Sequence, residues 1–334
     1  MTHEPSRILL TGGAGFIGSN LVHHLLRARP DVTIVTVDKL TYAGDRANLH
    51  DLPDPSRHRL VVADIADPAA MNALVADEQI DTVLHLAAES HVDRSISGPA
   101  PFLHTNVLGT WTLLEAARRY WIDQGGPGRP CRFHHVSTDE VYGDLGPDDP
   151  AFAETTPYAP SSPYSATKAA SDHLVHAWGR TFGVPFTMSN CSNNYGPRQH
   201  PEKLIPVVIR SCAARRPIPV YGKGENVRDW LHVDDHCAAI DHIVRHGANG
   251  HTYNVGGDNE WKNLDLVREI CRTYARIAGA DEAEILGLIT FVTDRAGHDR
   301  RYAIDGRKLR GIGWSPTWPF ADGLDQTVAW YLER

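Results

Sequence analysis

The chain alternates short apolar runs with longer segments in which apolar residues recur every three or four positions. After a first run before Gly12, apolar runs lie at 32–37, 59–62, 82–86, 132–136 and 184–189. Helical periodicity marks the segment after Gly18 and the ranges 68–78, 104–120 and 164–182. Short buried runs separated by amphipathic helices predict a Rossmann-type α/β fold, a doubly wound parallel sheet covered by helices on both faces.

The pattern changes after about residue 190. From there on, prolines and glycines punctuate shorter elements, for example at 193–206, 217–224 and 297–302. We therefore expect residues 1–190 to form one α/β domain, and residues 191–334 to form mainly a smaller substrate-binding region interleaved with it. The strand ends, including Asp64-Ile65 and Leu86-Ala87-Ala88, share one sheet edge, where ligands bind in doubly wound folds.

A glycine-rich turn joins the first apolar run to the first helix. Gly12, Gly15 and Gly18 permit a tight turn, close approach of the backbone to a pyrophosphate and close packing of helix on strand. The helix that follows offers its free N–H groups to phosphates. Asp38 ends the second run, twenty residues beyond Gly18, where an acid binds the adenine ribose and repels a 2′-phosphate. The spacing predicts NAD rather than NADP, and Lys39 beside Asp38 weakens that preference.

Tyr164 and Lys168 stand four residues apart, so they share one face of the predicted helix 164–182. A nearby cation favours phenolate, and we expect Lys168 to lower the pKa of Tyr164 from its usual value of about 10. Such a base can take the proton of a sugar hydroxyl while a hydride leaves the same carbon. Asp139 and Glu140 follow the 132–136 run. Two adjacent carboxyls beside a redox site suggest a second step, in which a proton is removed and a hydroxyl is expelled.

The composition fits a globular enzyme of 334 residues, with 42% hydrophobic and 22% charged residues. The net charge of −8 disfavours binding to nucleic acid or to an anionic membrane through bulk electrostatics. Five widely spaced cysteines indicate free thiols in a reducing, cytoplasmic setting. The 19 histidines show no metal-ligand spacing, so we expect no metal site, and no apolar run is long enough for a membrane span.

Longer motifs extend these observations over most of the chain. They lie at 38–44 (DKLTYAG), 87–95 (AAESHVDRS), 137–143 (STDEVYG), 191–197 (CSNNYGP), 201–206 (PEKLIP), 226–230 (NVRDW) and 297–302 (GHDRRY). With the glycine-rich start and the Tyr164/Lys168 pair, they make the chain resemble the extended short-chain dehydrogenase/reductases, and among them the nucleotide-sugar 4,6-dehydratases. The resemblance runs from about residue 7 to residue 331.

The resemblance implies an NAD-dependent hydro-lyase that converts a nucleotide-activated glucose, above all dTDP-glucose, to the 4-keto-6-deoxy sugar. It implies that Thr138 hydrogen-bonds the sugar O4 and that Tyr164 removes the O4 proton while C4 gives a hydride to NAD. Glu140 then takes the C5 proton, a protonated Asp139 donates to the departing C6 hydroxyl, and the hydride returns to C6. Lys168 tunes Tyr164 and holds the nicotinamide ribose.

The resemblance also implies two sets of contact residues. Those expected to bind NAD are Gly12, Gly15, Phe16, Ile17, Gly18, Asp38, Lys39, Leu40, Thr41, Asp64, Ile65, Leu86, Ala87, Ala88, Thr105, Tyr164, Lys168 and Asn194. Those expected to bind the nucleotide sugar are Ser90, Thr138, Asn193, Lys203, Leu204, Pro219, Tyr221, Arg228, Asn263, Asp294, Arg295 and His298. Arg228 suits a diphosphate because its planar fork pairs two oxygens at once, and an ion pair with Asp229 or Asp234 is the alternative.

Three alternatives to this function are open at this point. A nucleotide-sugar 4-epimerase would share the fold, NAD and the Tyr164/Lys168 pair, but it has no use for Asp139 and Glu140. A dehydratase could act on another nucleoside diphosphate glucose. A non-catalytic sensor would not need the intact catalytic set. As the resemblance implies, we expect a homodimer in which helices 104–120 and 164–182 pair in a four-helix interface.

Overall fold

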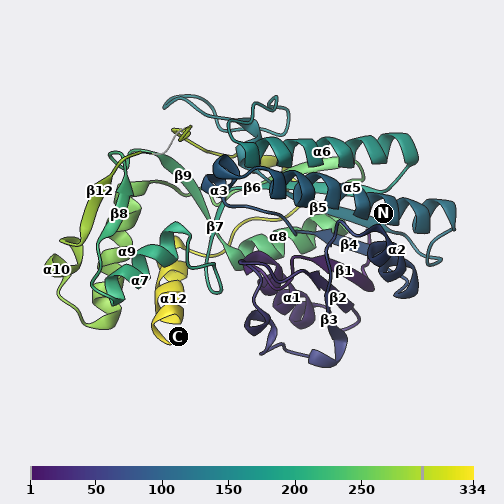
Figure 1. The fold of residues 1–334 in the computed structure, drawn as a ribbon, viewed down its shortest axis with the longest axis horizontal. Helices are drawn as coiled ribbons and strands as arrows, with labels where there is room; N and C mark the ends of the chain where they lie inside the picture. Colours follow the sequence, from purple (N-terminus) through teal and green to yellow (C-terminus); the bar gives the residue numbers. More distant parts are fainter. Residues whose placement is uncertain (1, 295–296) are drawn as a thin grey trace.

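The computed structural model describes residues 2–294 and 297–334, and its centre is a sheet of seven parallel strands (Figure 1). The strands follow the order β3-β2-β1-β4-β5-β6-β10. Their bounds are Arg7–Thr11 (β1), Thr33–Asp38 (β2), His58–Val62 (β3), Thr82–His85 (β4), Arg132–Thr138 (β5), Phe186–Cys191 (β6) and His251–Val255 (β10). Each predicted apolar run forms one of these strands, so the predicted doubly wound sheet is confirmed.

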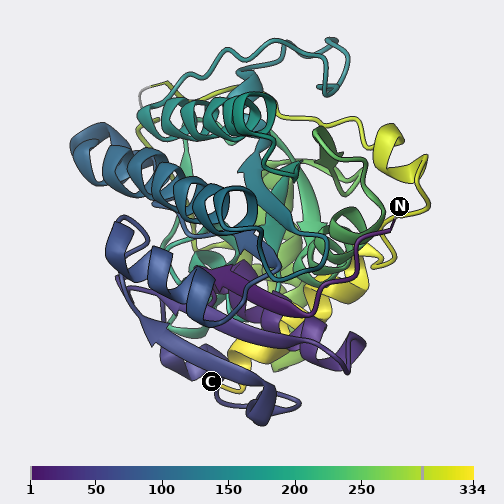
Figure 2. The ribbon, with the colours of Figure 1, turned by 90° about the vertical axis from the view of Figure 1, so that its right-hand side faces the viewer.

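Helices cover both faces of the sheet (Figure 2). On one face α2 (Pro68–Asp77), α5 (Thr110–Ala117) and α6 (Pro163–Phe182) share a buried cluster with the strands. On the other face α1 (Phe16–Ala28) packs beside α8 (Val233–His246). The predicted helix 104–120 is the middle of a continuous helical run from 100 to 123, in which 103–109 and 118–123 are wound as π-helix.

The start and end of α6 are fixed by local chemistry, and this positions the predicted catalytic pair. Ser162 accepts a hydrogen bond from the Ser165 amide at 3.1 Å, while the Ser165 hydroxyl accepts one from the Ser162 amide at 3.0 Å. This reciprocal cap satisfies two donors that the first turn leaves unpaired. Gly183 ends the helix in the left-handed conformation, with φ 75°. Tyr164 therefore lies in a well-fixed first turn.

The rest of the chain builds a second core beside the first, at the left of Figure 1. It holds the three-stranded sheet β11-β9-β7 and the two-stranded sheet β12-β8. The strand bounds are Asn193–Tyr195 (β7), Ile218–Tyr221 (β8), Val227–His232 (β9), Glu260–Lys262 (β11) and Ile289–Val292 (β12). The helices of this part are α7 (Leu204–Ala213), α9 (Asn263–Ala278), α10 (Glu282–Leu286) and α12 (Phe320–Leu332).

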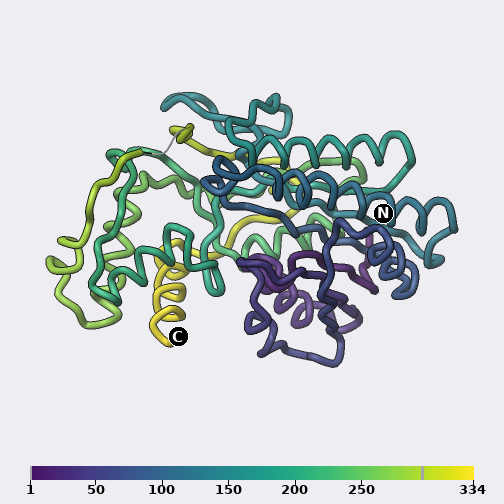
Figure 3. Tube along the Cα trace, viewed as in Figure 1, coloured from purple at the N-terminus to yellow at the C-terminus, as the bar shows by residue number. Residues whose placement is uncertain are grey.

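The chain passes between the two parts more than once (Figure 3). After β9 it returns to the first sheet for α8 and β10, and it then leaves again for β11 and α9. Short elements complete the fold: α3 (Val92–Ser97), α4 (Ala100–Phe102), α11 (Arg307–Arg310) and 3₁₀ turns at Arg46–Leu49, Pro55–Arg57 and Asp139–Tyr142. Within the described ranges, no helix combines the length and apolarity needed to cross a membrane.

Candidate active site

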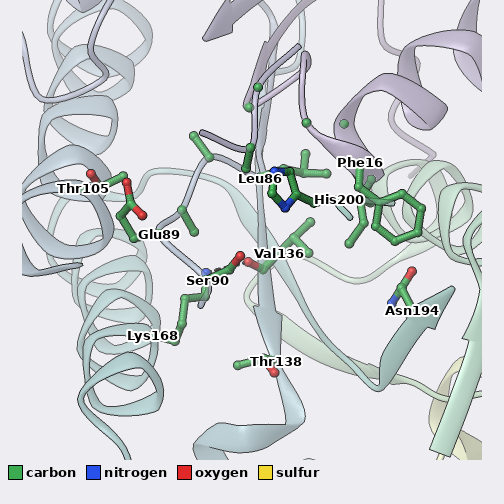
Figure 4. Close-up of a pocket in the computed structure, with 18 of the residues that line it drawn as sticks. Phe16, Leu86, Glu89, Ser90, Thr105, Val136, Thr138, Lys168, Asn194 and His200 are labelled. Carbon is green, nitrogen blue, oxygen red and sulfur yellow. Dashed lines mark hydrogen bonds between the residues drawn. The ribbon is translucent and has the colours of Figure 1, made fainter. Parts of the chain in front are cut away.

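A cleft of about 300 Å³ opens at the carboxyl ends of β1, β2, β4, β5 and β6. The five residues predicted to be catalytic all line it, as do all the predicted NAD contacts except Leu40 and Asp64. In Figure 4, Phe16 and Asn194 lie on one side of the pocket, Thr105, Glu89 and Lys168 lie on the other, and His200 lies between them. The fold therefore brings the glycine-rich turn and the 137–140 segment to one site.

The glycine-rich turn leaves no room for side chains. Gly12 has φ +72°, and a Cβ on it would lie 2.8 Å from the Ala87 backbone. A Cβ on Gly18 would lie 2.1 Å from the Gly12 carbonyl oxygen. Gly15, which precedes α1, provides no side-chain cap, so the first N–H groups of α1 lack a side-chain acceptor from that position. These features fit the pyrophosphate of a dinucleotide.

Asp38 is buried at the end of β2, where an adenine ribose is expected. Its carboxylate accepts the Ala14 amide at 3.0 Å and the Leu40 amide at 2.8 Å, which leaves lone pairs for ribose hydroxyls. The Lys39 ammonium lies 3.5 Å from Asp64 Oδ2 and 3.2 Å from Thr105 Oγ1. Leu40 and Asp64 do not line the cleft themselves, but they contact Asp38 and Lys39, which do. The residues present fit NAD.

Tyr164 and Lys168 are both buried, and their pKa values differ from the expectation. Burial, followed by the charge of Glu140, raises the pKa of Tyr164 well above its usual value, and a hydrogen bond with Thr138 opposes that rise. Lys168 donates to the Val136 carbonyl at 2.8 Å. The expected lowering of the Tyr164 pKa by Lys168 is therefore wrong for this structure: burial of the phenol dominates, and the Lys168 ammonium is bonded to the Val136 carbonyl.

Asp139 lies in the 3₁₀ turn after β5 and is fully enclosed. Burial raises its pKa well above the usual value, and the charges of Glu140 and Asp229 raise it further. Its Oδ1 accepts a weak hydrogen bond from Thr138 Oγ1 at 3.3 Å, and its buried Oδ2 has no hydrogen-bond partner among the described residues. These surroundings favour the neutral acid over the carboxylate, which suits Asp139 to carry a proton and donate it.

The predicted nucleotide-sugar contacts fall into two groups. Ser90, Thr138, Asn193 and Lys203 line the cleft, and Lys203 Nζ donates to the Ser90 carbonyl at 3.1 Å. The others that the structure describes lie outside the cleft wall, in the C-terminal part: Leu204, Pro219, Tyr221, Arg228, Asn263, Asp294 and His298. Arg295 lies outside the described residues.

Arg228 is held in a way that the sequence did not predict. Its guanidinium donates to the Val227 carbonyl at 2.7 Å and the Asp299 carbonyl at 2.9 Å, and it stacks 4.1 Å from the centre of the Tyr302 ring. Asp229, the alternative partner, instead accepts backbone amides at 2.8 and 2.6 Å. Arg228 therefore carries a positive charge that is paired mainly with carbonyl dipoles.

Sequence reasoning missed several lining residues, including Tyr42, Glu89, Ser137, Cys191, Gln199, His200 and Glu202. Three distant segments meet here: the Arg94 guanidinium lies 3.8 Å from the centre of the Tyr42 ring and 2.8 Å from Glu202 Oε2. These residues fall within or beside the long motifs, which could have marked the segments. No local spacing indicates which side chains of those motifs face the cleft.

Comparisons with known proteins agree with this geometry. The family description GDP-mannose 4,6 dehydratase matches residues 9–327. The chain is 54% identical to dTDP-glucose 4,6-dehydratase 1 of Escherichia coli K12, over 98% of this chain and 93% of that protein. It is similar to the crystal structure of the dTDP-glucose 4,6-dehydratase DesIV from Streptomyces venezuelae with NAD bound, at 45% identity, TM-score 0.88 and coverage of 98% and 97%. It is also similar to the UDP-glucose 4-epimerase complex with NAD from Thermus thermophilus, at 27% identity, TM-score 0.84 and coverage of 98% and 99%.

Proposed function

This chain belongs to the GDP-mannose 4,6-dehydratase family, and on that premise we propose the reaction and the residue roles that its own site supports best. The chain is an NAD-dependent hydro-lyase that converts dTDP-glucose to the 4-keto-6-deoxy sugar. The observation that carries this function is the pairing of Asp139, a buried acid whose surroundings raise its pKa, with Glu140 in the cleft that also holds Tyr164 and Lys168.

NAD is assigned mainly to residues 1–190 and the nucleotide sugar mainly to residues 191–334. The glycine turn would hold the pyrophosphate, Asp38 the adenine ribose, and Lys168 the nicotinamide ribose. When bound, NAD would supply the redox chemistry, as the acceptor of the C4 hydride and its donor to C6, and the positive charge of its oxidised form would favour the phenolate form of Tyr164.

Oxidation at C4 needs a group that takes the O4 proton. Tyr164 is assigned this role because it lines the cleft and hydrogen-bonds Thr138, which can also bind the sugar O4. The high pKa of Tyr164 in this structure makes it a strong base once it is deprotonated. The buried Lys168 ammonium orients the reacting groups from the second turn of α6.

Elimination follows because a 4-ketone acidifies the C5 proton. Glu140 takes that proton, the C6–O bond breaks, and Asp139 gives its proton to the departing hydroxyl, which leaves as water. Once C6 has received the hydride, Glu140 gives its proton back to C5. Asp139 can do this only while it is protonated, and its burial together with the charge of Glu140 favours that form. A 4-epimerase needs no such donor, which favours the dehydratase over the epimerase despite the shared fold.

A homodimer is part of the proposal. Large apolar side chains are exposed along the helical run 100–123 and at the end of α6: Leu103, Leu108, Trp111, Ile122 and Phe182. Two copies pairing these helices would cover them. Sedimentation at micromolar concentration should show a dimer, and Trp111→Glu should give a monomer; a monomeric wild type contradicts the proposal. The five free cysteines support a reducing, cytoplasmic setting.

The test of function is a side-by-side assay of dTDP-, UDP-, CDP- and GDP-glucose with the NAD-loaded protein. We expect dTDP-glucose to be converted fastest, with a 4-keto-6-deoxy sugar as the product. A 4-epimer without loss of water would replace the dehydratase by an epimerase. Faster conversion of another nucleotide would correct the substrate, and no turnover of any of the four would overturn the proposal.

A further inference from the structure

A fully buried carboxylate lies beneath the catalytic pair and has no role in the steps above. Asp172 is on α6, four residues after Lys168 and eight after Tyr164, so the three side chains project from nearly the same side of the helix. Its own side chain is completely enclosed. An enclosed acid is costly unless its charge is balanced, so its partners indicate what it does.

The partners of Asp172 join α6 to β5. Its Oδ2 accepts the Ser137 hydroxyl at 2.8 Å, and its Oδ1 lies 3.1 Å from His135 Nε2. The nearby Tyr158 hydroxyl also lowers the pKa of Asp172. One residue further along β5 from His135, the Val136 carbonyl accepts Lys168 Nζ at 2.8 Å. Three successive residues of β5 are therefore tied to α6, immediately before the strand reaches Thr138, Asp139 and Glu140.

Asp172 and Lys168 also act on each other electrostatically. Burial raises the pKa of Asp172 to about 6, and the Lys168 charge is the largest influence that opposes this rise. Burial lowers the pKa of Lys168, and the Asp172 charge is the largest influence that opposes this fall. His135 cannot take the place of the ammonium, because burial and then Lys168 lower its pKa well below the usual value and keep it neutral. The other titratable groups that face this pair are Tyr142, Tyr158, His176, Cys191 and His85.

We propose that Asp172 is a positioning residue whose buried carboxylate keeps the Lys168 ammonium charged and holds α6 in register with β5. The register matters because α6 carries Tyr164 and Lys168, which serve the oxidation, whereas β5 leads into Asp139 and Glu140, which serve the elimination. One acid between them thus holds both halves of the reaction in a single geometry. This inference rests on the proposed function for its consequence in catalysis, while the charge state of Lys168 can be measured without substrate.

The direct test is the titration of Lys168 in the NAD-loaded protein. The chain has six lysines, so ¹³C-labelled lysine side chains give few NMR signals, and that of Lys168 is the one lost in Lys168→Arg. In Asp172→Asn the midpoint should fall by about one pH unit or more, because removing a nearby opposite charge shifts a pKa by roughly 1–3 units. Ser171→Ala is the control, since it removes the 3.1 Å contact with His135 and the 2.7 Å hydrogen bond to the Lys168 carbonyl without removing a charge. Its Lys168 midpoint should equal that of the wild type.

The rate of dTDP-glucose conversion should follow the titration. We expect the alkaline limb of the kcat profile to move to lower pH in Asp172→Asn and to stay in place in Ser171→Ala. An unmoved Lys168 midpoint in a folded Asp172→Asn protein overturns the inference. Should that variant not fold, Ser137→Ala takes its place. Losing the 2.8 Å hydrogen-bond donor makes Asp172 easier to protonate, so the acidic limb of the kcat profile should move to higher pH. An acidic limb at the wild-type pH overturns the inference. A wild type that does not convert dTDP-glucose would refute the proposed function, and the Lys168 titration would still decide the role of Asp172.

Discussion

Asp139→Asn removes an ionisable group from the interior while it keeps the size of the side chain. Burial raises the pKa of Asp139, with Glu140 and Asp229 adding to the rise. When the pKa of a carboxyl is higher in the folded state than in the unfolded state, the group contributes its full stabilisation of the fold below the unfolded-state pKa of about 3.9. That stabilisation is lost as the pH rises towards the pKa of the folded state. Within that window each pH unit lowers the free energy of unfolding of the wild type by ~1.4 kcal/mol relative to the variant. Asparagine has no proton to lose.

The assay is thermal unfolding of both proteins from pH 4 upwards, paired with product formation at pH 7. The melting temperature of Asp139→Asn minus that of the wild type should rise with pH, by roughly 2–3 °C per pH unit for a chain of this size. The exposed Asp148→Asn is the control and should show no such trend. Product formation by Asp139→Asn should fall by about 10²–10⁴-fold. A melting difference that stays flat with pH would show that Asp139 is ionised when folded and would refute its role as the acid.

Three further substitutions separate the other roles. Glu140→Gln should leave C4 oxidation intact but slow product formation by about 10²–10⁴-fold. The absorbance of reduced cofactor should therefore build up on mixing with substrate. Product formation at the wild-type rate would show that Glu140 has no role in the elimination. Tyr164→Phe should give neither product nor that absorbance, and a normal absorbance rise would remove Tyr164 as the base. Asp38→Ala should weaken NAD binding and reduce the ratio of the affinity for NAD to the affinity for NADP, both measured by equilibrium titration. An unchanged affinity ratio would contradict the assignment of Asp38 to the ribose.

The fold could be predicted as far as its signals were local. The apolar runs, the glycine turn and the helix after it are short-range patterns, and all became the expected elements. The strand β10 was missed because its five residues come from beyond residue 190 and pair with β6 only through the tertiary fold. The π-helical winding inside 100–123 likewise leaves no periodicity that differs clearly from that of an α-helix.

For the site, too, the sequence predicted what depends on local pattern and missed what depends on tertiary contacts. Asp139 and Glu140 could be placed because a strand end carries them to the ligand-binding edge of the sheet. The raised pKa of Tyr164 could not be predicted, because the sequence shows its neighbour Lys168 but not how far water is excluded around the phenol. Asp172 gave no indication either: its contact with Ser137 depends on two elements that meet only in the fold.

The central claim is that one site oxidises C4, eliminates water across C5 and C6, and reduces C6 with the same hydride. The most direct measurement uses dTDP-glucose deuterated at C4 with the NAD-loaded protein, followed by mass and NMR analysis of the product. The account predicts a 4-keto-6-deoxy sugar that carries the deuterium at C6, with no net release of reduced cofactor. Release of reduced cofactor in proportion to product, or a product without deuterium at C6, would contradict it.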